Sequence, residues 1–115
     1  ISRTRIIPFQ VSSPNFITQK KVQGQKLFNP SIKKIKELSN KIILIENADP
    51  GFDWIFSANI LALVTKYGGI NSHMSIRCAE LGIPAAIGCG DQIFSQLLKK
   101  KSIYLDCSSS AIYSI

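Results

Sequence analysis

The pattern of apolar and polar positions changes near residue 40 of this 115-residue chain. Residues 16–28 mix β-forming residues with glutamine and lysine, which predicts a solvent-facing strand or hairpin. Residues 42–45 and 60–65 are short, continuous apolar runs, which are typical of buried strands. We interpret the change as a shift within a single domain over residues 1–115. The N-terminal part is expected to be rich in strands, and strands and helices are expected to alternate in the C-terminal part.

Capping residues predict helices between these strands. Asp49 is a good N-cap and Pro50 suits the first helical position after it. Asp91 is expected to cap a later helix, and Gly82 to end a helix over residues 72–81. Alternating strands and helices predict a parallel or mixed sheet with right-handed crossovers. Further strands are expected over residues 85–87, 102–105 and 111–115.

Composition narrows the class of protein. Hydrophobic residues make up 45% of the chain, which excludes a disordered tail and suffices for a core. No run of 18 apolar residues and no charged-then-apolar leader is present, so we expect no membrane span and a cytoplasmic location. The three cysteines include no CxxC pair, so we expect free thiols and no metal site.

The net charge of +7 allows two interpretations. A basic net charge is typical of proteins that bind nucleic acids. Here, however, the lysines are scattered, few aromatic residues lie among them, and no nucleic-acid-binding motif accompanies them. We therefore expect no nucleic-acid partner. A solvated basic surface and attraction to a phosphate-bearing ligand or an acidic partner both stay open.

Candidate chemistry centres on the single histidine, His73. It follows the double glycine Gly68-Gly69 and lies where a helix is expected to begin. Glycines let the backbone turn sharply and approach a ligand closely. The first N–H groups of a helix and its positive dipole end favour an anion. Asn71 and Ser72 add side-chain donors, and either could cap the helix.

The expected helix start suits the imidazole for phosphoryl chemistry. The positive helix end opposes protonation of the ring, and a neutral ring offers a nitrogen lone pair. A phosphoryl group taken up by that nitrogen is anionic, so the same helix end stabilises it. A structural histidine, a general base and a metal ligand are the alternatives. Neither a Ser-His-Asp order nor a Walker lysine accompanies His73.

Two consecutive segments resemble a known family. Residues 68–76 (GGINSHMSI) and 79–88 (AELGIPAAIG) resemble the phosphohistidine swivelling domain of phosphoenolpyruvate-utilising enzymes. That family includes phosphoenolpyruvate synthase, pyruvate phosphate dikinase, rifampicin phosphotransferase and enzyme I of the sugar phosphotransferase system. Residues 49–52 (DPGF) and 11–14 (VSSP) resemble further turns of the family. The resemblance implies an α/β fold, a swivelling β/β/α domain with mixed sheets and flanking helices.

The resemblance also implies a role for each part of the motif. His73 would be phosphorylated transiently, at Nε2, and would carry the phosphoryl group from an ATP-grasp nucleotide-binding domain to a pyruvate/phosphoenolpyruvate-binding domain. ATP and Mg²⁺ would bind to those partner domains and no cofactor to this one. The domain would be a piece of a larger multidomain protein and incomplete as an enzyme by itself. The implied phosphate-binding residues are Gly68, Gly69, Asn71, Ser72 and Arg77.

The chain also departs from the family pattern. Ile70-Asn71 replaces the Arg-Thr pair of many members, and Asn71 cannot be phosphorylated as that threonine can. Arg77, one helical turn beyond His73, could reach a phosphate or face solvent. Two alternatives therefore stay open: the same histidine relay with another acceptor, as in rifampicin phosphotransferase or enzyme I, and a non-catalytic interaction module that keeps the fold.

Overall fold

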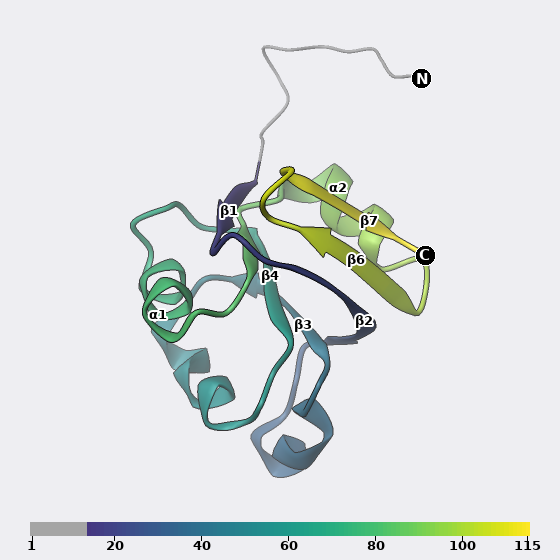
Figure 1. Ribbon diagram of the computed structural model, residues 1–115. Helices are drawn as coiled ribbons and strands as arrows, with labels where there is room; N and C mark the ends of the chain where they lie inside the picture. The colour runs from purple at the N-terminus through teal and green to yellow at the C-terminus, as the bar shows by residue number, and fades with distance from the viewer. Residues whose placement is uncertain (1–13) are drawn as a thin grey trace.

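A seven-stranded mixed sheet organises residues 14–115, the part of the chain that the computed structural model describes (Figure 1). Its strand order is β1-β5-β4-β3-β2-β6-β7. The central strands β2 to β5 pair in parallel, whereas β1 at one edge and β6 and β7 at the other pair antiparallel. The expected α/β fold with a mixed sheet is confirmed. The strands are β1 (Asn15–Ile17), β2 (Lys21–Phe28), β3 (Ile42–Asn47), β4 (Ala62–Tyr67), β5 (Ala85–Ile87), β6 (Ser102–Asp106) and β7 (Ala111–Ser114).

Of the two forms expected over residues 16–28, a strand or a hairpin, the strand is confirmed and the hairpin is wrong. β1 and β2 do not pair with each other: β1 pairs with β5, and β2 pairs with β3 and β6. Only residues 18–20 connect β1 to β2, yet β5, β4 and β3 separate them in the sheet. The sheet must therefore curl, and Figure 1 shows β6 and β7 folded over towards β1. The register depends on distant partners, so local alternation did not reveal it.

Helices cover both faces of this sheet. The 3-10 helices η2 (Ile32–Leu38) and η3 (Pro50–Ser57) and the α-helix α1 (His73–Leu81) contribute to one core cluster. The second α-helix, α2 (Gly90–Leu97), packs on the other face with β6. Ile43 and Ile45 of β3 belong to the first cluster, and Ile42 and Leu44 belong to the second. Because side chains alternate across a strand, burial on both faces explains the unbroken apolar run.

The helix ends confirm most of the predicted caps. Asp49 Oδ1 accepts a hydrogen bond from the Gly51 N–H at 2.8 Å, and Pro50 opens η3. Gly82 ends α1 in the left-handed conformation, with φ of 71°. The prediction that Asp91 caps α2 is wrong, because Cys89 is the N-cap residue and provides no side-chain bond. The Asp91 carboxylate instead forms an ion pair with Lys66 at 2.9 Å.

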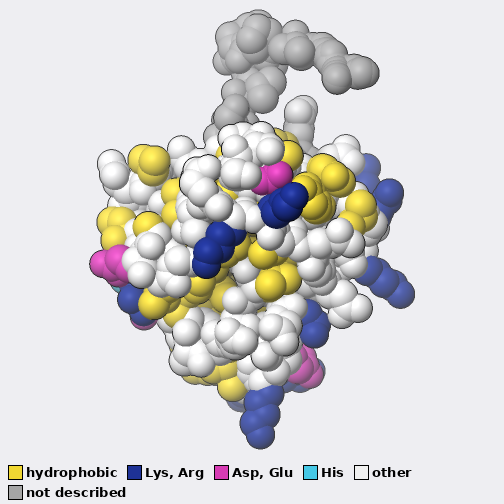
Figure 2. All heavy atoms as spheres, in the orientation of Figure 1, with side chains coloured by type: hydrophobic (Ala, Val, Ile, Leu, Met, Phe, Trp, Pro, Cys, Tyr) yellow, Lys and Arg dark blue, Asp and Glu magenta, His cyan; other side chains and the backbone are white. Residues whose placement is uncertain are grey.

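The surface agrees with the scattered charge of the sequence. On the face drawn in Figure 2, lysine and arginine side chains stand apart rather than in one continuous patch. No helix within residues 14–115 has the length and apolar character needed to cross a membrane. The resemblance over residues 11–14 lies mostly outside the described residues.

Candidate functional site: a histidine at a helix start

Two neighbouring parallel strands bring the site together. β3 and β4 pair in register up to Asn47 and Tyr67, so both strands end at the same edge of the sheet. η3 follows β3 and carries Asp53, and α1 follows β4 and begins with His73. Ligands of open α/β sheets bind at this carboxyl edge. The sheet therefore places two segments that are far apart in sequence beside each other.

The loop before α1 depends on two glycines in close contact. Gly68 has φ of +127° and Gly88 has φ of +77°, in the region that L side chains rarely adopt. A Cβ on Gly88 would lie 2.3 Å from the Gly68 carbonyl oxygen, and a Cβ on Gly68 would lie 2.6 Å from the Ala48 Cβ. A Cβ on Gly69 would meet nothing within 4 Å. Gly68 and Gly88 thus fix the loop, and Gly69 leaves its outer surface open.

Ser72 is the N-cap of α1, which settles the choice between Asn71 and Ser72. Its Oγ accepts a hydrogen bond from the Ser75 N–H at 3.4 Å, and its own N–H donates to the Gly69 carbonyl at 3.0 Å. Asn71 is exposed just before the cap. The cap leaves the imidazole of His73 on the first turn, where the N–H groups have no acceptor within the helix.

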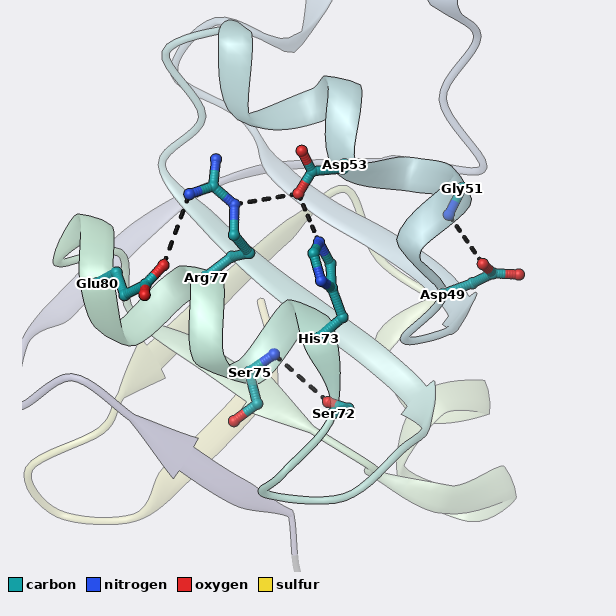
Figure 3. A network of polar contacts seen from close by, with 8 residues as sticks. All are labelled: Asp49, Gly51, Asp53, Ser72, His73, Ser75, Arg77 and Glu80. Atoms are coloured by element: carbon teal, nitrogen blue, oxygen red, sulfur yellow. Dashed lines mark hydrogen bonds and ion pairs between the residues drawn. The ribbon is translucent and has the colours of Figure 1, made fainter.

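A carboxylate joins His73 to Arg77 (Figure 3). Asp53 Oδ1 lies 2.8 Å from His73 Nε2 and also accepts a hydrogen bond from Arg77 Nε at 3.1 Å. Arg77 reaches Glu80 as well, with 3.6 Å between Nη1 and Oε1. Its guanidinium lies over the Phe56 ring, with Cζ 5.4 Å from the ring centroid. Asp53 therefore contacts both predicted site residues of α1.

The contacts of Asp53 determine its ionisation. The hydrogen bond from His73 is the largest cause that holds the pKa of the Asp53 carboxyl below its usual range. Desolvation, the next largest, opposes this shift, and the contacts with Arg77 add to the lowering. Asp53 is consequently a carboxylate near neutral pH and can only accept hydrogen bonds. The side chains of His73 and Asp53 are 41% and 44% exposed, so an incoming phosphate can reach the imidazole.

The structure brings the predicted residues together and adds one. His73 and Arg77 share a partner, and Gly68, Gly69, Asn71 and Ser72 form the loop that precedes the histidine. The Arg77 side chain does not simply point into solvent, because it forms ion pairs with Asp53 and Glu80. Sequence reasoning missed Asp53, which lies 20 residues before His73. The sequence offered one signal, the Asp49-Pro50 helix start that leads to Asp53. The strand order that brings this helix beside His73 is seen only in the structure.

The cysteines do not contribute to this site. Cys78, Cys89 and Cys107 are free thiols, as expected, and all are buried. Burial raises the pKa of Cys78 and of Cys89 to about 12, so both stay protonated. Among residues 14–115 no group of three or more His, Cys, Asp or Glu side chains is placed to hold a metal ion.

The fold and the site define an α/β domain with an exposed histidine at the start of a helix. The chain belongs to the family of PEP-utilising enzyme mobile domains, whose sequence model matches residues 38–110. The matched range contains Asp53, His73 and Arg77.

Curated relatives give the context in which this domain occurs. A probable phosphoenolpyruvate synthase of Staphylothermus marinus is 32% identical over 90 residues, which cover 76% of this chain and 10% of the relative. Phosphoenolpyruvate synthase of Neisseria meningitidis is 30% identical over 93 residues, which cover 74% of this chain and 11% of the relative. The enzyme of Synechocystis is 36% identical over 70 residues, or 60% and 8% of the two chains. The chain thus spans about a tenth of the length of these relatives.

Proposed function

We propose that this chain is a phosphoryl carrier in which His73 is phosphorylated and dephosphorylated in turn. The observation that carries the proposal is the exposed imidazole on the first turn of α1, in a chain of the mobile-domain family. The ring lone pair attacks phosphorus, an N–P bond forms and the bond from phosphorus to the donor breaks. The helix N-terminus then faces an anion, which its dipole favours.

The other sites of the relay belong to partner domains. An ATP-grasp nucleotide-binding domain would supply the phosphoryl group with ATP and Mg²⁺, and a pyruvate/phosphoenolpyruvate-binding domain would receive it. The names of the relatives, which are phosphoenolpyruvate synthases, support phosphoenolpyruvate as one of the compounds that the relay serves. The chain itself contributes the carrier histidine and the surface around it.

The residues around His73 would bind the phosphoryl group. Gly69 has open space beside it, so an oxygen anion can approach its backbone. Asn71 and Ser72 directly precede the histidine at the helix start, and Arg77 supplies a guanidinium one turn further along. Gly68 acts through the shape of the loop. Loss of any of these contacts should weaken phosphorylation without moving it to another residue.

Labelling tests the carrier role. The chain is incubated with radiolabelled phosphoenolpyruvate and a phosphoenolpyruvate synthase whose own carrier histidine has been replaced. We expect an adduct of about 80 Da that is labile in acid and stable in base. The adduct should be absent from His73→Ala and from His73→Gln, which keeps a polar side chain of similar reach. An adduct that persists in both variants, or a wild-type chain that takes up no label, would refute the role.

A further inference from the structure

We propose that Asp53 occupies, in the unphosphorylated protein, the place that the phosphoryl group takes on His73, and that Arg77 binds whichever of the two anions is present. The inference rests on the proposed function and adds a positioning residue to it. It predicts that Asp53 restrains phosphorylation and that Arg77 supports the phosphorylated state.

The two distances to Asp53 carry the argument. Oδ1 lies 2.8 Å from His73 Nε2 and 3.1 Å from Arg77 Nε (Figure 3). An oxygen of a phosphoryl group on Nε2 is two bonds from that nitrogen, so it falls within the space that Oδ1 now fills. The same oxygen would meet the N–H of Arg77. A phosphoryl group brings about 1.5 to 2 negative charges, so it and the carboxylate repel each other there.

The proton on the ring leads to the same conclusion. Asp53 is an acceptor, so the neutral ring donates from Nε2 and keeps its lone pair on Nδ1. Transfer to Nε2 needs the opposite tautomer. Asp53 must therefore leave, and the ring must lose the Nε2 proton to water and gain one at Nδ1. The N–P bond then forms as the bond from phosphorus to the donor breaks, and the ring carries one proton, on Nδ1, before and after this transfer.

Arg77 has contacts that do not depend on Asp53. Its guanidinium lies over Phe56 and its Nη1 lies 3.6 Å from Glu80 Oε1, so it can stay in place when the carboxylate moves. Asp53 can move at little structural cost, because its side chain is 44% exposed and the buried residue of η3 is Ile55. A change of the Asp53 rotamer therefore exchanges the two anions without disturbing the core.

Chemical phosphorylation tests the exchange without a partner domain. Phosphoramidate, a small donor that phosphorylates histidine, is added to the whole chain, whose single histidine confines the reaction to one imidazole. Asp53→Asn should react faster and reach a higher phosphorylated fraction, on the order of tenfold, because one negative charge near the phosphoryl group is gone. Asp49→Asn is the matched control, since it removes a charge from the same helix start and keeps the cap to Gly51.

Nitrogen NMR of the labelled imidazole reports the contact itself. At a pH where the ring is neutral, we expect a proton on Nε2 in the wild type, loss of that preference in Asp53→Asn, and phosphorus bound to Nε2 after reaction. Arg77→Gln should shorten the lifetime of the phosphohistidine several-fold. Slower or unchanged reaction in Asp53→Asn, or phosphorus on Nδ1 with the Asp53 contact intact, would overturn the inference. Failure of enzyme-driven labelling alone would instead overturn the carrier role.

Discussion

The contact between Gly88 and Gly68 makes a quantitative prediction about the loop that presents His73. In Gly88→Ala, the new Cβ would lie 2.3 Å from a backbone oxygen, which no side-chain rotation can relieve. The left-handed backbone costs an L residue about 1–2 kcal/mol, and forcing an extra methyl group into a filled site costs about 1–3 kcal/mol. We therefore expect the free energy of unfolding to fall by about 2–5 kcal/mol, a large part of a typical domain's stability.

Gly82→Ala separates the two contributions. Gly82 has nearly the same backbone conformation, with φ of +71° against +77° for Gly88. A Cβ there would meet only Lys20 Nζ, at an ordinary contact distance of 3.6 Å. This variant should lose only the backbone cost, about 1–2 kcal/mol.

Urea denaturation followed by fluorescence of the single tryptophan, Trp54, measures both variants. Equal losses in Gly88→Ala and Gly82→Ala, to within about 0.5 kcal/mol, would refute the close approach of the two glycines. If the approach is real, Gly88→Ala also displaces the Gly68 carbonyl and should slow phosphorylation of His73, whereas Gly82→Ala should not.

Four further variants test the cap, the open loop and a buried carboxylate. Ser72→Ala should lose about 0.5–2 kcal/mol of stability in urea denaturation, and Asn71→Ala much less, because only Ser72 caps α1. Gly69→Ala should keep its melting temperature, because its Cβ would meet no atom within 4 Å. It should lose phosphoramidate reactivity, because that Cβ would occupy the space in which we propose that the phosphoryl group binds. Hydrogen bonds from Ser108 and Ser109 hold the pKa of Asp106 below its usual range. Asp106 therefore contributes to the free energy of unfolding above its unfolded pKa near 4, and this contribution is lost as the pH falls through the lower folded pKa. In urea denaturation, Asp106→Asn should be less stable than wild type at pH 7, and the two should be alike near pH 2.

Local signals in the sequence were sufficient for much of the fold. Residues 42–45 and 85–87 gave buried strands because both faces of each strand pack against apolar groups. Asp49 and Gly82 gave helix ends because capping depends on neighbours within a few residues. The pairing of β1 with β5 could not be foreseen, since strand partners are chosen by packing between distant segments.

The residues of the candidate site likewise fall into those that local sequence predicts and those that it does not. The family motif gave His73 and its loop, which are contiguous, but not Asp53, which reaches the ring only because β3 and β4 are neighbours in the sheet. Asp91 is the opposite case, a contact that was predicted and is absent. Aspartate suits an N-cap, but the Asp91 carboxylate forms an ion pair with Lys66 of β4 instead. Residue type and spacing thus predict contacts along the chain, whereas contacts between elements follow from the order of strands.

The pairing of Asp53 with Arg77 suits a carrier because a carrier must release what it binds. A guanidinium without a partner beside His73 would favour the phosphorylated state strongly, and transfer to an acceptor would then lose that interaction. If His73 is phosphorylated as we propose, Arg77 would have an anion before and after that step, since Asp53 binds it in the unphosphorylated protein. Its net preference would then be the difference between two contacts, and the two states would be closer in free energy. Removing Asp53 should therefore speed loading of the carrier and slow its discharge to an acceptor, two rates that a purely structural role would change together.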